Sequence, residues 1–120
     1  MSMKDFVQNV QEYSARGQDY IYKPVTDDAT GTTVDLISPQ SGYYTKIVGF
    51  VISTTGAGVL EIKFNDETVI HLEFNQRKSE PFTFPFPIKV NDTTTVKAYF
   101  KADSGTVTCY ITAIYHYEKI

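Results

Sequence analysis

The strongest constraint on this chain is a two-residue hydrophobic period that recurs in short segments over most of its length. In residues 59–64, for example, the apolar Leu60 and Ile62 alternate with the charged Glu61 and Lys63. Successive side chains of a β-strand point to opposite faces, so this alternation is typical of a strand with one buried face. The sequence therefore predicts an all-β chain.

Clusters of Gly, Pro, Asn, Asp and Ser separate these segments, as expected of turns. We expect strands over residues 34–37, 43–54, 59–64, 68–74, 81–90, 96–101 and 106–117. Prolines confine 81–90 to a sheet edge, whereas the long segments 43–54 and 106–117 suit sheet centres. This series, uninterrupted by helical periods, favours an antiparallel β-sandwich of jelly-roll type. The alternative is an immunoglobulin-like sandwich, although the paired Cys and the Trp of true immunoglobulin domains are absent.

The N-terminal region has a different period. Apolar residues recur every three or four positions between residues 2 and 16, which predicts a short amphipathic α-helix. Its apolar stripe consists of Met3, Phe6, Val7, Val10 and Tyr13. An isolated helix this short is marginal in water, so the stripe must cover either its own domain or a neighbouring subunit. We interpret 18–32 as a polar linker, which divides the chain into an arm, 1–32, and a β-sandwich domain, 33–120.

Composition excludes several classes of partner. The chain has 120 residues, a single-domain length, and a net charge of −3 with eleven scattered basic residues. Nucleic-acid binding and attachment to anionic membranes both need clustered positive charge, so we expect neither. No apolar run approaches the ~20 residues that span a bilayer, and the first five residues lack the apolar core of a signal peptide. We therefore expect synthesis in the cytoplasm.

Few side chains in the sequence suit catalysis or metal binding. Cys109 lies in an alternating segment, where a buried thiol is expected rather than a nucleophile. His71 and His116 occupy polar-face positions of separate strands and lack the ligand spacing of a zinc site. Carboxylates concentrate in turns, where bonds to backbone N–H groups account for them. We expect no catalytic residue, no cofactor, no metal ligand and no enzymatic activity.

The chain is rich in aromatic residues, with nine Tyr and eight Phe. Exposed tyrosines stack on sugars and are enriched at protein interfaces, because they combine apolar area with a polar tip. If the odd-numbered residues of 111–117 face the core, Tyr110 and Ile114 face outward and make that surface unusually apolar. We predict interface or glycan contacts at Tyr43, Tyr44, Tyr110 and Ile114.

The segments 44–53, 58–63, 84–90 and 105–110 resemble, in order and rhythm, small β-sandwich proteins of tailed-phage and related virus particles. Those proteins include capsid decoration (cement) proteins and head- or tail-fibre modules. The resemblance covers residues 43–117 and implies a virion protein. It also implies a homo-oligomer, often a trimer, that contacts other capsid or tail proteins, and it implies no catalytic residue.

Three functions are compatible with these observations. The leading hypothesis is a virion structural protein, a capsid decoration or fibre component that acts through oligomerisation and arm contacts. The second is a carbohydrate-binding or host-adhesion module with a shallow site beside Tyr43 and Tyr44, although the absence of Trp counts against a sugar platform. The third is a small cupin-like enzyme, which would need a cluster of metal-binding histidines rather than the two scattered ones present.

Overall fold

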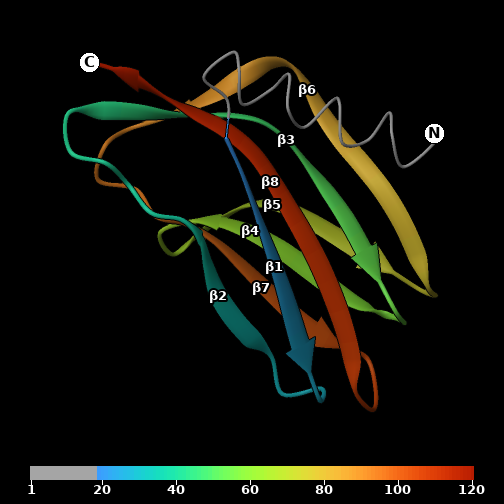
Figure 1. The fold of residues 1–120 in the computed structure, drawn as a ribbon. Coiled ribbons are helices and arrows are strands. Elements are labelled where there is room, and N and C mark those ends of the chain that lie inside the picture. The colour runs from blue at the N-terminus through green and yellow to red at the C-terminus, as the bar shows by residue number, and fades with distance from the viewer. Residues whose placement is uncertain (1–18) are drawn as a thin grey trace.

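Eight β-strands make up residues 19–120, the part of the chain that the computed structural model describes (Figure 1). The strands are β1 (Asp19–Asp27), β2 (Thr32–Ile37), β3 (Tyr43–Thr54), β4 (Gly58–Phe64), β5 (Glu67–Phe74), β6 (Lys78–Val90), β7 (Val96–Ala102) and β8 (Val107–Lys119). Every strand that the sequence predicts is present, with bounds shifted by a few residues. The expected helix over residues 2–16 and its apolar stripe lie outside the described residues.

The strands form two four-stranded antiparallel sheets. The first sheet has the order β1-β8-β3-β6 and the second the order β2-β7-β4-β5. In Figure 1 the sheet with β1 and β8 lies in front of the sheet with β4 and β7. Two packed sheets with this strand order make an eight-stranded jelly roll, which confirms the predicted fold class. The immunoglobulin-like alternative is wrong, because its sheets would follow a different strand order.

The centre and the edge of the first sheet lie where the sequence predicts them. The long strands β3 and β8 are its two central strands, and proline-rich β6 is an edge strand. Gly49 lies where the pairing register between β3 and β6 shifts. A Cβ atom there would meet the backbone of Phe82 and Thr83, so this close approach requires glycine.

Residues 19–27 differ from the linker expected there, because they form β1. This strand pairs with β8 from Asp19 opposite Tyr115 to Asp27 opposite Val107. Ile21 and Val25 contribute to the core from its inner face. The β-sandwich therefore includes residues 19–27 in addition to the expected range, 33–120.

Side chains from the inner faces of both sheets form one core. Its buried apolar members are Val25, Leu36, Ile37, Ile47, Phe50, Ile52, Leu60, Ile62, Phe74, Val90, Val96, Ala98, Phe100, Ala102, Val107, Cys109, Ile111 and Ala113. The two sheets approach most closely where β1 faces β2 and β7. On the opposite side, β5 and β6 are the sheet edges, and most of their inner-facing apolar residues, all except Phe74 and Val90, are only partly buried. The sandwich is thus closed at the β1 edge and open at the β6 edge.

The carboxylate of Asp27 ties the β1–β2 turn to the second sheet. It accepts hydrogen bonds from the backbone N–H groups of Ala29 (2.8 Å), Gly31 (2.7 Å) and Ala102 (2.8 Å). Ala102 ends β7, so the last of these bonds crosses between the sheets. The turn needs this support because Ala29 and Gly31 both have positive φ, of 79° and 92°.

Burial acts to raise the pKa of the Asp27 carboxyl. The hydrogen bonds from Ala102, Gly31 and Ala29, with one from the Thr32 hydroxyl, outweigh that effect and hold the pKa below its usual value. A lowered folded-state pKa means that the carboxylate stabilises the fold above its unfolded-state pKa. This stabilisation is lost as pH falls through the folded-state pKa.

Replacing Asp27 should therefore alter both stability and its pH dependence. We expect Asp27→Asn to lower the Tm at pH 7 and to flatten the decline of the free energy of unfolding below about pH 4. The neighbouring substitution Asp28→Asn should have a smaller effect, because the exposed Asp28 carboxylate accepts a hydrogen bond from the Thr30 hydroxyl alone. Thermal and urea unfolding between pH 2 and 7 measure both quantities. Equal acid sensitivity of the two variants would contradict the role given to Asp27.

Candidate protein interaction surface

The outer face of the first sheet carries large apolar and aromatic side chains where solvated residues are expected. Its exposed members are Tyr20 and Tyr22 on β1, Val51 on β3 and Tyr110 on β8, together with the partly buried Ile114 on β8. We call these five residues the tyrosine face. Their exposed fractions are 50%, 54%, 43% and 36% for Tyr20, Tyr22, Val51 and Tyr110. Exposed apolar side chains on three adjacent strands are typical of a contact surface.

The strand register brings these side chains together. Tyr20 lies directly opposite Ile114, while Tyr22 and Val51 lie on either side of Thr112. The rings of Tyr22 and Tyr110 stack, with centroids 6.0 Å apart and planes 14° from parallel. Aromatic pairs across strands stabilise a sheet and fix their own rotamers. A partner would therefore meet a surface that is already ordered, which lowers the entropic cost of binding.

The four residues predicted as contacts fall into two groups. Tyr110 and Ile114 belong to the tyrosine face, as their outward alternation predicts. Tyr43 and Tyr44 are partly buried at the start of β3, and the ammonium of Lys89 lies 4.2 Å from the Tyr44 ring centroid. Tyr44 lies opposite Glu118, which is four residues from Ile114 along β8, or about 13 Å in an extended strand. The structure therefore does not bring the two groups together.

Sequence reasoning missed Tyr20, Tyr22 and Val51 as members of this surface. The two tyrosines alternate with Ile21, but Pro24 and a polar segment follow them, which favours a linker rather than a strand. Val51 lies in a segment in which both faces are apolar, so the sequence alone does not show which side is exposed.

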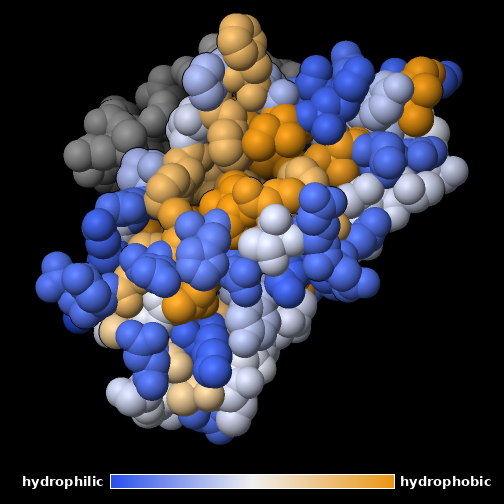
Figure 2. All heavy atoms as spheres, turned by 180° about the vertical axis from the view of Figure 1, so that it is seen from behind, coloured by the Kyte–Doolittle hydropathy of each residue, from blue (hydrophilic) through white to orange (hydrophobic). Residues whose placement is uncertain are grey.

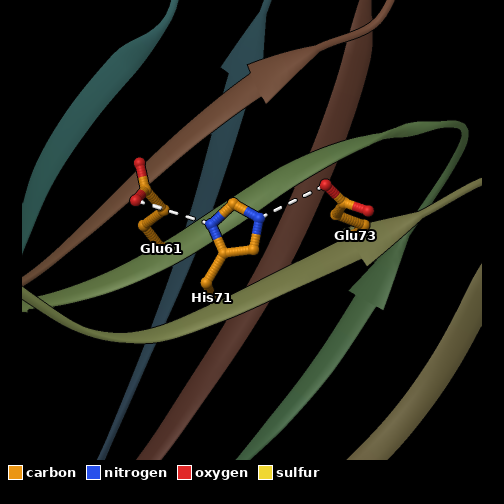
Figure 3. A network of polar contacts seen from close by, with 3 residues as sticks. All are labelled: Glu61, His71 and Glu73. Carbon is orange, nitrogen blue, oxygen red and sulfur yellow. Dashed lines mark hydrogen bonds and ion pairs between the residues drawn. The ribbon is translucent and has the colours of Figure 1, made fainter.

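The outer face of the second sheet is charged and solvated. His71 lies between two carboxylates, with Nδ1 3.6 Å from Glu61 and Nε2 3.4 Å from Glu73 (Figure 3). Lys63 lies 5.2 Å from the ring centroid of Tyr99 on the same face. Exposed polar contacts of this kind contribute little to stability. The outer face of the second sheet is thus charged, whereas the outer face of the first sheet carries the apolar tyrosine face.

Within residues 19–120, no cluster of three His, Cys, Asp or Glu side chains has the arrangement of a metal site. Likewise, no helix in that range is long and apolar enough to cross a membrane. His71 is solvent-exposed, as predicted, whereas His116 is half-buried. Cys109 lies in the core opposite Val25 and Thr54, and burial raises the pKa of its thiol to about 12.

Cys109 should therefore be chemically inert in the folded protein. At pH 8 a thiol with this pKa is ionised in only roughly one molecule in ten thousand, and the thiolate is the reactive form. We expect a maleimide to label Cys109 only as fast as the protein unfolds, and rapidly in denaturing urea. Mass spectrometry of timed samples measures both rates. Rapid labelling of the native protein would show an accessible thiol and contradict this account.

No protein-family model matches the chain, and no curated protein matches it either. The solved structures that share its fold include two chains of phage capsids. One is a chain of the capsid asymmetric unit of cyanophage Pam1, with a TM-score of 0.56 and 12% identity, covering 82% of this chain and 83% of that one. The other is a chain of the acid-stable capsid of Helicobacter pylori bacteriophage KHP30, with a TM-score of 0.60 and 13% identity, covering 86% and 92%. The chain therefore has the jelly-roll fold of chains found in phage capsids, over most of the length of each.

Proposed function

We propose that this protein is a structural component of a virus particle, specifically a capsid decoration protein. The observation that carries the proposal is the tyrosine face on a fold shared with phage capsid chains. A decoration protein works by binding other protein surfaces, and the tyrosine face has the composition that such binding needs. Its place of action is the virion.

Covering the tyrosine face with another protein removes apolar side chains from water, which is favourable. Fully burying one large apolar side chain stabilises a complex by about 1.5–3 kcal/mol. Tyr22 and Tyr110 keep their hydroxyl groups available for hydrogen bonds while their rings are covered. Tyrosine is enriched at interfaces for this reason, and charged residues are depleted at interface centres. The tyrosine face contains three tyrosines and no charged residue, whereas the outer face of the second sheet carries Glu61, Lys63 and Glu73.

The size of the two neighbours favours decoration over a fibre. Each match covers nearly equal shares of both chains, so each neighbour is a small chain of similar length. A fibre component would commonly carry this domain within a longer chain.

We infer that the protein assembles with copies of itself, as a trimer, and contacts other capsid proteins.

A carbohydrate-binding or host-adhesion role is the second candidate. The stacked pair Tyr22 and Tyr110 supports it, because exposed tyrosine rings also stack on sugars. A glycan array separates the two roles. Binding that Tyr22→Ser abolishes would favour adhesion, and the absence of glycan binding would favour decoration.

Val51 and Val69 provide a matched test of the proposed contact surface. Both are exposed valines, at 43% and 42%, but Val51 belongs to the tyrosine face and Val69 lies on β5 of the other sheet. We expect Val51→Lys to weaken self-association about tenfold or more, because it places a charge in an apolar contact. Val69→Lys should leave self-association unchanged.

Sedimentation velocity over a range of concentrations measures this difference, and thermal unfolding checks that both variants remain folded. Equal association of the two variants would overturn the assignment of the tyrosine face. A monomeric wild-type protein at all concentrations would overturn the proposed homo-oligomer.

A further inference from the structure

A second apolar surface, distinct from the tyrosine face, lies on the open side of the sandwich. It consists of Ile70 and Leu72 on β5 and of Phe82, Phe84 and Ile88 on β6, all of which pack partly buried against the core. We call these five residues the open-side cluster. Figure 2 shows apolar atoms gathered in a band on the rear of the molecule, flanked by polar side chains. Between Phe84 and Ile88 on β6, Phe86 is 83% exposed, the largest exposed fraction among the exposed large hydrophobic residues of the described part.

We propose that the N-terminal segment of the same chain covers the open-side cluster with its apolar stripe. The sequence predicts an amphipathic helix over residues 2–16, whose stripe needs an apolar surface to pack against. The open-side cluster is an apolar surface that needs a cover. Packing the stripe on the open-side cluster would therefore bury both apolar surfaces.

The point at which the segment joins the sandwich supports this assignment. Asp19, the first described residue, lies in one row across the inner side of the first sheet with Tyr115, Ile47 and Ile88. Ile88 belongs to the open-side cluster. Three strand spacings separate β1 from β6, which is about 14 Å.

The length of the segment is sufficient to cross that distance. A helix over residues 2–16 would be about 22 Å long, and Gly17 and Gln18 would provide a short connection. The stripe of a helix that ended near Asp19 would reach Ile88 and continue past it. Because the connection is short, the segment meets its own sandwich at an effective concentration in the millimolar range. This favours its own chain over a second copy as the occupant.

The inference is independent of the proposed function. The tyrosine face lies on the outer side of the first sheet, whereas the open-side cluster lies between the sheet edges. Loss of the stripe should therefore lower stability without reducing the assembled mass. Val51→Lys, which disrupts the contact but keeps the stacked tyrosines, should reduce the mass without lowering stability.

Two double variants of the full chain test the proposal. Phe6→Asp with Val10→Asp disrupts the stripe, while Gln8→Asp with Gln11→Asp adds the same charge to the predicted polar face. For the stripe variant we expect a fall in Tm of about 5 °C or more and increased binding of a fluorescent dye that detects exposed apolar surface. The control variant should resemble the wild type in both measurements, and light scattering should give all three proteins the same mass.

Two results would overturn the proposal. Equal Tm and dye binding in the stripe and control variants would mean that the stripe covers nothing in this protein. A lower mass for the stripe variant alone, measured well below its Tm, would mean that the stripe contacts a neighbouring subunit instead.

Discussion

The register between β3 and β8 is the constraint on which the rest of the structure depends. These two central strands pair over their length, with Ile52 opposite Ile111 and Phe50 opposite Ala113 on the core side. Because side chains alternate, the register that buries these residues also directs Tyr110 and Ile114 outward. A slip of one residue would expose the core and bury the tyrosines. The core and the candidate interaction surface are thus two consequences of one pairing.

Much of this architecture could be predicted because it depends on local periodicity and turn chemistry. The bounds of β3 follow from its β-branched run, and the prolines of β6 place it at an edge. The sequence does not predict the first strand, because Pro24 and the polar residues after it favour a linker. In addition, Lys23 and Asp27 occupy inner-face positions that an alternating strand normally fills with apolar residues. Asp27 is tolerated there because amides of its own turn and of β7 hydrogen-bond to it. That compensation comes from residues distant in sequence and has no local signal.

The same missing strand explains why the candidate surface could be predicted only in part. Tyr110 and Ile114 were assigned an outward orientation from the alternation of the final strand alone. Tyr20 and Tyr22 join them only because β1 pairs with β8. Tyr43 and Tyr44 share the residue type but lie at the far end of β3, so composition grouped residues that the sheet separates. Two apolar surfaces result, and we assign them different occupants, a partner protein and the N-terminal segment.

The central claim is that the tyrosine face is covered by protein when the molecule assembles. Hydroxyl-radical footprinting at low and high protein concentration tests this most directly, because it reports the solvent exposure of individual side chains. The account predicts that oxidation of Tyr20, Tyr22 and Tyr110 falls as concentration rises, while oxidation of Tyr99 on the opposite sheet stays constant. Equal oxidation of the first three tyrosines at all concentrations, or protection of Tyr99 instead, would contradict it.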